Sequence, residues 1–561
     1  MSVTSNQQST AVKTTSATPS QTTIGGQVGN NQTVTKELPQ SKLVLMWGMI
    51  LIGYFLFVVQ WYSIGNFAGG YNTNIGAVTG NPALSSMPNW TITLMRGIGS
   101  ILAGYLLAKV GHRYAVITVL SLMVLSFPFL IVVGIKWDYP SGGYNEIAFG
   151  LFLFFRLFLA IGGTTLITYT NSVIAKMPVQ KRPTFMTINQ FGFNGGAFFA
   201  NFFFCFGLSS VINGSQAVWL TILTLLLAFI AIILVIYIIF GMEVLPPQKK
   251  QNQKFQNDEV TFGKVFKQGY TWKMSTIFIV WLIAVVFINS ATMRNVIEQS
   301  PANLEALMRW NLKENQIAPT IAASTLGTKD SVVVGSGYNW VWPTFICMFV
   351  AGFFVGLLFI SPMNKTIYKR KLFIHTMFIL GFVFAAISLS IGYFGGYGNP
   401  VALAFFFIFI FISGMFLWAV QPVLLSLYQQ APQSNPKYAG IISGLIWGIG
   451  YVGYTVFELL FSVIASYAGD ANAFKHWMDA FNQASGSDAK GAVLAMVGEY
   501  TAPVGNIVTI VFFFIVCLLI FIPIQMLPPA GVKDKDGNFV PFTKTWTPLQ
   551  WNFKKPEVMI K

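Results

Sequence analysis

Residues 216–241 read QAVWLTILTLLLAFIAIILVIYIIFG, a stretch without a charged side chain. At about 1.5 Å of rise per residue, a helix of this length crosses the roughly 30 Å of hydrocarbon in a bilayer. Eleven further apolar runs of similar length flank it, at residues 43–65, 86–108, 114–136, 147–175, 184–208, 274–297, 339–361, 372–394, 401–428, 438–467 and 503–527. The sequence therefore predicts an all-α polytopic membrane protein with twelve transmembrane helices.

The composition of the whole chain excludes most other classes of protein. Of its 561 residues, 54% are hydrophobic and only 9% are charged, too few to cover a soluble particle with polar surface. The 3 Cys residues fall inside apolar runs and the 3 His residues lack metal-ligand spacing, so we predict neither a disulfide framework nor a metal site. The sequence also lacks phosphate-binding loops, zinc-protease motifs and nucleophile elbows, so we expect no cofactor and no enzymatic activity.

The distribution of basic residues predicts which side of the membrane each loop faces. Most of the 34 Lys and Arg residues lie in the two tails and in the loops that follow even-numbered spans, as is typical of cytoplasmic segments. Both termini are therefore predicted to be cytoplasmic, in a protein of the cell membrane. The formal net charge of +16 reflects this bias, and we expect no nucleic-acid partner.

Polar segments divide the chain into parts. The first segment is rich in Ser, Thr, Gln and Asn, a composition that cannot bury enough apolar surface to fold. A polar, basic segment follows the sixth span and separates two sets of six. In chain order, the predicted parts are a disordered cytoplasmic tail at 1–41, a six-helix bundle at 42–241, a cytoplasmic linker at 242–273, a second six-helix bundle at 274–528 with external loops at 298–338 and 468–502, and a cytoplasmic tail at 529–561.

The loop between the second and third spans carries a recognisable pattern, Gly104-Tyr-Leu-Leu-Ala108-Lys109-Val-Gly111-His-Arg113. It resembles the loop signature of the major facilitator superfamily (MFS), Gly-x-x-x-Asp-Arg/Lys-x-Gly-x-Arg/Lys. By this resemblance Gly104 would allow close helix packing, Gly111 would form the tight turn, and Lys109 and Arg113 would complete a cytoplasmic gating motif. Ala108 replaces the family's Asp, which places a charged latch of the usual kind in doubt.

The fourth span adds a second match to the same superfamily. Arg156-Leu-Phe-Leu-Ala160-Ile-Gly162-Gly163 is similar to its Arg-x-x-x-Gly-x-Gly, and the bias toward Phe, Asn and Gln with long external loops resembles the divergent mycoplasma-type branch. The resemblance implies two pseudo-symmetric six-helix bundles around a central cavity that is lined by the first, fourth, seventh and tenth helices. It also implies a monomeric transporter that works by alternating access, with a small solute and the lipid bilayer as partners.

Charged residues inside the predicted spans mark candidate functional positions, because a charge at membrane depth costs about 2.5–3.5 kcal/mol on insertion scales. Arg96 and Arg156 lie near the middle of their spans, and the first half has no embedded Asp or Glu to neutralise them. Two buried guanidiniums favour an anionic solute, and the mycoplasma-type branch has been associated by similarity with sugar phosphates. The alternative for Arg156 is a role in ordering the helix bundle or tuning coupling, and the alternative for Arg96 is that its side chain snorkels into a wet cavity.

Arg294 and Glu458 are the charged candidates of the second half. Each lies 21 residues from the nearest cytoplasmic lysine of its span, Lys273 and Lys437, which places both near the outer face. We predict a mutual ion pair or an outer gate rather than direct substrate binding. Because Glu458 is the only embedded carboxylate and lies far from the midplane, we expect uniport or anion exchange rather than proton coupling.

Neutral polar side chains support a competing interpretation. Aromatic and amide groups suit a neutral sugar or a nucleoside as well as they suit helix packing. By analogy with the superfamily, the candidates on cavity-lining helices are Gln60, Tyr62, Asn289, Trp418 and Gln421. A protein that kept the fold and lost transport, acting as a receptor or scaffold, is an alternative of another class.

The eleventh span carries Gly440, Gly444 and Gly448, one at every fourth residue. Glycines in a row on one helix face let a neighbouring backbone approach closely. We predict a packing role for this row rather than a ligand role.

Overall fold

The computed structural model describes nearly all of the apolar part of the chain. The described residues are 38–67, 87–134, 146–178, 181–205, 216–244, 261–298, 300–303, 305–306, 338, 340–363, 370–429, 436–467, 504–527, 530–533, 539–541 and 558–560. Most of the predicted tail 1–41, most of the loop 298–338 and all of the loop 468–502 lie outside them. The described residues from Gln40 onward belong to one structural unit.

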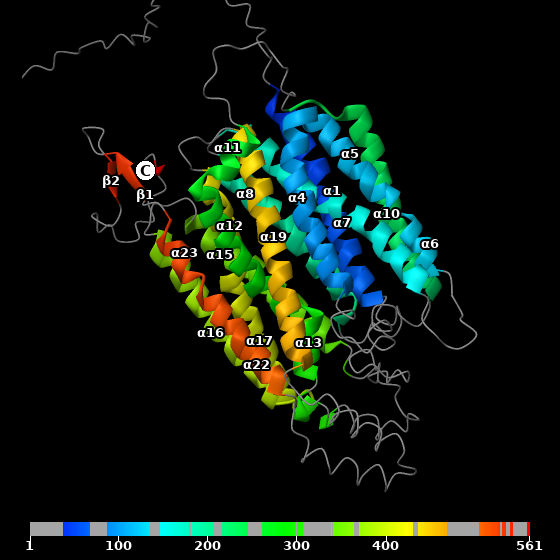
Figure 1. Ribbon diagram of the computed structural model, residues 1–561, viewed down its shortest axis with the longest axis vertical. Helices are drawn as coiled ribbons and strands as arrows, with labels where there is room; N and C mark the ends of the chain where they lie inside the picture. Colours follow the sequence, from blue (N-terminus) through cyan, green and yellow to red (C-terminus); the bar gives the residue numbers. More distant parts are fainter. Residues whose placement is uncertain are drawn as a thin grey trace, which may run out of the picture. The chain divides into compact units, whose positions relative to one another are not determined.

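Helices occupy all twelve predicted spans (Figure 1). The first half of the chain contains α1 (Gln40–Phe67), α4 (Met87–Val110), α5 (His112–Leu125), α6 (Pro128–Gly134), α7 (Glu146–Ile174), α8 (Arg182–Phe202) and α10 (Gln216–Phe240). The second half contains α11 (Phe262–Lys267), α12 (Gly269–Val286), the 3₁₀ turn η2 (Phe287–Asn289), α13 (Ala291–Glu298), α15 (Val341–Met363), α16 (Arg370–Phe394), α17 (Pro400–Leu417), α18 (Gln421–Gln429), α19 (Pro436–Tyr467), α22 (Val504–Leu518) and α23 (Phe521–Gln525). The prediction of an α-helical polytopic membrane protein is confirmed.

Four of the predicted spans consist of two helical pieces. In three of them proline lies among the first three residues of the second piece, at Pro128, Pro422 and Pro523, where it removes a backbone donor and crowds the preceding turn. The fourth is the predicted span 274–297. It starts earlier, at Gly269, and passes through η2 into α13. The end of the predicted linker 242–273 is therefore helical, as α11 and the first turn of α12.

Helix α8 differs from the other membrane helices in its polarity. In the described part of the chain, 11 helices are long and apolar enough to cross a membrane, and α8 is not among them. Its polar side chains Asn189, Gln190, Asn194 and Asn201 are all buried. Because α8 packs against both α1 and α15, these amide groups face protein. Facing lipid, they would lack hydrogen-bond partners at a cost in free energy.

Helices α4 and α19 lie side by side along most of their length (Figure 1). A Cβ added at Gly444 would lie 2.6 Å from the Ser100 carbonyl oxygen, closer than real Cβ atoms approach, so the predicted packing role of the glycine row is confirmed. Gly104 faces the same helix, but a Cβ there would lie at an ordinary 3.5 Å from Ile441 Cα. Its contribution to close packing is therefore smaller than predicted.

The C-terminal tail 529–561, predicted only as a cytoplasmic tail, adds a small β-sheet to the helical fold. Its antiparallel strands are β1 (Ala530–Lys533), β2 (Phe539–Pro541) and β3 (Val558–Ile560), in the order β2-β1-β3. Val532 lies opposite Val540 on one side and Val558 on the other. Strands of three or four residues are too short to give a periodic signal in the sequence.

Candidate functional site

Arg96 lies where helices from both halves of the chain meet. It is 4% exposed. Its Nε donates a hydrogen bond to Thr164 Oγ1 of α7 over 3.2 Å, and its Nη2 donates to Tyr451 Oη of α19 over 2.6 Å. The guanidinium carbon also lies 4.3 Å from the centre of the Tyr451 ring. Arg96 thus ties α4 to α7 and α19 through neutral partners.

Arg156 of α7 is equally buried but differently paired. It is 2% exposed, and its Nε and Nη1 have no hydrogen-bond partner in the described part of the chain. Its guanidinium carbon lies 4.8 Å from the centre of the Trp61 ring. The guanidinium carbon of Arg96 lies 5.5 Å from the centre of the same ring. One indole of α1 therefore contacts two cations.

The helices around these cations carry almost no negative charge. The sequences of α1, α4 and α8 contain no Asp or Glu, the only acid of α7 is its first residue, Glu146, and the only acid of α19 is Glu458. Arg156 lies ten residues further along α7, about 15 Å away along the axis. A buried charged group without a counter-ion is costly, so an anionic ligand would relieve the electrostatic cost here.

A chain of aromatic rings starts and ends at Arg96. Its guanidinium carbon lies 5.7 Å from the ring of Phe193 on α8 and 4.3 Å from that of Tyr451. Between them, consecutive ring centres lie 5.6–6.0 Å apart along Phe193, Trp418, Trp281, Trp447 and Tyr451. These five rings, called here the aromatic belt, run from Phe193 of α8 through the second half of the chain to Tyr451. The indole Nε1 atoms of Trp418 and Trp447 have no partner in the described residues.

The neutral candidates differ in their contacts. The Tyr62 ring lies 6.2 Å from that of Phe193, and Trp418 belongs to the aromatic belt, so both adjoin Arg96 through Phe193. Gln421 accepts a hydrogen bond from Asn194 of α8 over 3.4 Å, which joins α18 to α8. Gln60 is fully buried and neither of its side-chain polar atoms has a partner among described residues.

Asn289 differs from the other neutral candidates in its hydrogen bonding. Its Nδ2 donates to the Val285 carbonyl of its own helical segment over 2.9 Å. Its Oδ1 has no partner in the described part of the chain. This local hydrogen bond gives no link to the arginines.

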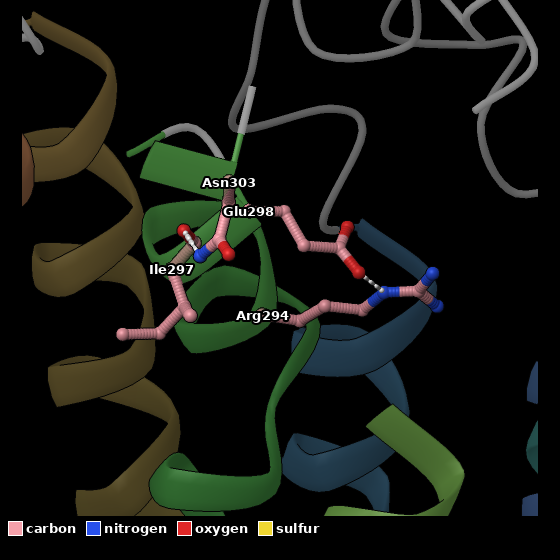
Figure 2. Close-up of polar contacts among 4 residues, drawn as sticks. All are labelled: Arg294, Ile297, Glu298 and Asn303. Carbon is pink, nitrogen blue, oxygen red and sulfur yellow. Dashed lines mark hydrogen bonds and ion pairs between the residues drawn. The ribbon is translucent and has the colours of Figure 1, made fainter. Parts of the chain in front are cut away.

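The predicted ion pair between Arg294 and Glu458 is not formed. Figure 2 shows Arg294 pointing to Glu298, one turn further along α13, with Nε 2.9 Å from Oε1. Glu458 is buried and shares a hydrogen bond with Thr93 of α4, while its Oε2 is unpaired within the described residues. The break at η2 gives Arg294 a partner within its own short helix, at the favourable i, i+4 spacing.

Asn303 anchors the same segment. Its Nδ2 donates to the Ile297 carbonyl (Figure 2) and to the Gly392 carbonyl of α16, both over 2.8 Å. The side-chain Oδ1 of Asn303 accepts the backbone N–H of Tyr397 over 2.6 Å. The C-terminal end of α13 is therefore held against the end of α16, and sequence analysis did not identify Asn303.

The gating motif has the predicted turn and an unpredicted acid. Gly111 adopts a φ of +85°, a conformation that favours glycine, and α5 begins at the next residue. Glu243, just after α10, accepts the backbone N–H groups of His112 over 2.7 Å and Arg113 over 3.2 Å. Lys109 is exposed, with Nζ 2.6 Å from Tyr105 Oη. A carboxylate thus caps the positive end of α5, although position 108 is Ala.

Arg113 completes the motif by reaching back to α10. Its Nη2 donates to the Ile238 carbonyl over 2.9 Å. Together with Glu243, this bond fixes the start of α5 against the end of α10. An acid directly after the sixth span was the sequence signal for this contact.

Two cysteines that lie far apart in sequence meet at the contact between α8 and α15. Cys205 Sγ lies 3.4 Å from Cys347 Sγ, and both are free thiols. Both are buried. Sequence analysis placed them in separate apolar runs and had no signal for their proximity.

Comparison with known proteins identifies the family. A family model described as Mycoplasma MFS transporter matches residues 152–466. A major facilitator superfamily transporter of Mycoplasma pneumoniae is 27% identical and covers 91% of this chain and 97% of its own, and one of Mycoplasma genitalium is 25% identical and covers 92% and 96%. The crystal structure of the MFS transporter FucP in the outward conformation matches with a TM-score of 0.50 at 13% identity, over 86% of this chain and 99% of its own, which shows a common fold. The chain belongs to the Mycoplasma branch of the major facilitator superfamily and is a multi-pass membrane transporter.

Proposed function

We propose that this transporter moves a small anionic organic solute, such as a sugar phosphate, and that Arg156 is its principal anion-binding residue. The observation that carries the proposal is the pair of unpartnered donors, Nε and Nη1, on a guanidinium that is 2% exposed. Phosphate and carboxylate oxygens are strong acceptors for guanidinium N–H donors, and these two donors point to different edges of the guanidinium plane, so separate solute oxygens would meet them. A solute that binds there would satisfy donors whose burial is otherwise uncompensated.

The two arginines have different proposed roles. Arg96 already donates to Thr164 and Tyr451, so it supplies positive charge from a fixed position. Arg156 has donors to spare and contacts the same Trp61 ring. The anion is therefore held by Arg156, and Arg96 raises the local positive potential without releasing its own partners.

The proposal includes a transport cycle by alternating access. The six-helix bundles 42–241 and 274–528 rock against each other and expose the arginines alternately to the two sides of the cell membrane. The basic loops, including Lys109 and Arg113, face the cytoplasm together with both termini. In the described parts of α1, α4, α7, α8 and α19 the acids are Glu146, at the first residue of α7, and Glu458 of α19, which is bonded to Thr93. Few acids therefore lie near the arginines, and we favour uniport or anion exchange by a monomer over proton coupling.

A neutral sugar or nucleoside is the second candidate solute. Gln60 carries an unpaired buried amide, and Trp418 and Trp447 each have an unpaired indole N–H in the described residues. Aromatic faces with such donors bind uncharged polar rings well. In that case the arginines order the helices and do not contact the solute.

Thermal unfolding of the detergent-purified protein separates the two candidates. Each sugar phosphate is compared with its neutral parent sugar, in the wild type, in Arg156→Gln and in Arg156→Lys. A ligand at 100 times its Kd adds roughly 2.7 kcal/mol to the free energy of unfolding. We expect stabilisation by the phosphates alone, lost in Arg156→Gln and reduced in Arg156→Lys, which keeps the charge but not the fork. Equal stabilisation by neutral sugars, unchanged in Arg156→Gln, would refute the anionic assignment.

A further inference from the structure

Four buried side chains from four helices form one continuous hydrogen-bonded chain. Trp47 Nε1 of α1 donates to Asn189 Oδ1 of α8 over 3.2 Å. Asn189 Nδ2 donates to Asn171 Oδ1 of α7 over 3.1 Å, and Asn171 Nδ2 donates to Ser443 Oγ of α19 over 3.0 Å. The two asparagines and the serine are 0% exposed. This chain, the amide relay, uses neutral groups only.

The amide relay lies near the helix ends that adjoin the Gly111 turn, called here the motif end. Trp47, Asn189 and Ser443 each lie seven residues after the first residue of their helix, and Asn171 lies three residues before the last residue of α7. At about 1.5 Å per residue, all four are within about 10 Å of the motif end. Lys181 Nζ and Gln40 Oε1, 3.1 Å apart, join the starts of α8 and α1 there.

The arginines lie on the far side of the amide relay from the motif end. Tyr451, which binds Arg96, is eight residues beyond Ser443 on α19, or about 12 Å along the axis. Thr164, the other partner of Arg96, is seven residues before Asn171 on α7, or about 10 Å. A solute leaving the arginines toward the motif end would have to pass this buried layer.

Only the last bond of the amide relay joins the first half of the chain to α19. Trp47, Asn189 and Asn171 all belong to the first half, and Ser443 belongs to the second. Next to this bond, a Cβ added at Gly440 would lie 2.7 Å from Ser172 Oγ, so α7 and α19 are in close contact there. The Asn171–Ser443 bond is therefore placed to hold the motif end closed.

We propose that the Asn171–Ser443 hydrogen bond, positioned by Asn189 and Trp47, is an uncharged latch that breaks when the motif end opens and re-forms when it closes. The motif's acidic position is Ala108, and Glu243 caps α5 inside the first half. A neutral pair costs little to desolvate when it re-forms, whereas two charges must shed tightly bound water. The inference rests on alternating access and is independent of the charge of the solute.

The test measures how often the motif end opens. Leu107 is buried against Gly440 at this end, so Leu107→Cys introduces a reporter thiol into the full-length chain. Its rate of reaction with a water-soluble maleimide is measured in detergent, with the parent chain, whose three cysteines are buried, as the background. Relay variants are Asn171→Leu and Ser443→Ala. The matched control is Thr170→Val, which removes a buried hydroxyl whose bond in the described part of the chain is to the Ile167 carbonyl of its own helix.

We expect Asn171→Leu and Ser443→Ala to raise the labelling rate about tenfold, in line with loss of one buried hydrogen bond. The double variant should label no faster than the faster single variant, because both changes break the same bond. Thr170→Val should label as the parent does. Unchanged labelling in Ser443→Ala with unaltered thermal unfolding, or an equal rise in Thr170→Val, would overturn the latch.

The labelling test does not require a solute. If neither phosphates nor neutral sugars stabilise the protein, the proposed function fails while the labelling result still decides the latch. If solute binding is normal and labelling is unchanged in both relay variants, the latch alone fails.

Discussion

The amide relay and the arginine site bury polar groups by opposite strategies. In the amide relay, each step from Trp47 to Ser443 is a hydrogen bond of 3.0–3.2 Å between side chains. Arg156, at the arginine site, and Gln60 of α1 are just as buried and carry polar atoms without partners in the described residues. Paired groups hold helices together, and buried unpaired groups are available to a ligand. This contrast distinguishes the proposed latch from the proposed binding site.

The largest expected effect comes from the unpaired side of this comparison. In proteoliposomes loaded for solute uptake, Arg156→Gln should lower the affinity for a sugar phosphate by at least about 30-fold, because the loss of a buried charge partner costs 2 kcal/mol or more. Initial uptake rates over a range of solute concentrations measure this change. The matched control is Gln60→Leu, which removes a buried amide. If Gln60→Leu lost as much phosphate uptake as Arg156→Gln, the loss would not be specific to the guanidinium.

Tyr451→Phe tests the paired arginine and should give the next largest effect. It removes the 2.6 Å hydrogen bond from Arg96, a bond to a charged group worth about 1.5–3 kcal/mol. We expect the free energy of unfolding to fall by about 2 kcal/mol, as measured by thermal unfolding. Recovery of most of that loss on adding a saturating anion would show that the freed Arg96 binds solute, contrary to its proposed fixed role.

Asn189→Leu and Gln60→Leu compare the two strategies directly, since both remove a fully buried amide. Asn189→Leu leaves Trp47 Nε1 and Asn171 Oδ1 without that partner, so we expect a loss of about 1–3 kcal/mol in unfolding free energy. Gln60→Leu removes atoms that had no partner, so stability should stay unchanged or rise. Equal destabilisation by both variants would mean that the Gln60 amide is paired in the membrane.

Glu243→Gln should have the smallest effect. The side-chain oxygen can still accept one N–H at the start of α5, but the negative charge near the positive helix end is lost. We expect a loss of about 0.3–1 kcal/mol in unfolding free energy that shrinks at high salt. Thermal unfolding at two salt concentrations measures it, and a loss that does not depend on salt would argue against the charge as its cause.

The sequence predicted the helices and the buried cations better than it predicted their partners. Hydrophobic runs predict the positions of all twelve spans. The polar α8 is included because phenylalanines and glycines separate its amide residues. Arg96 and Arg156 stand out because charge is costly in a membrane, whatever surrounds it. Their shared contact with Trp61 depends on how α1 rotates against α4 and α7, which no local pattern encodes.

The errors have two physical origins, a local break in one span and contacts between distant segments. Counting residues placed Arg294 and Glu458 at one height, but the turn η2 gave Arg294 a nearer partner in Glu298. Asn171 and Ser443 are 272 residues apart, and each alone resembles an ordinary packing residue of a membrane helix. Only the packing of four helices makes them part of one hydrogen-bonded chain.

The most direct test of the account is an experimental structure of the full-length protein with a sugar phosphate bound. We expect a phosphate oxygen about 2.7–2.9 Å from Nε or Nη1 of Arg156, with the Arg96 bonds to Thr164 and Tyr451 intact. A phosphate bound elsewhere in the bundle, with Arg156 still unpaired, would contradict it.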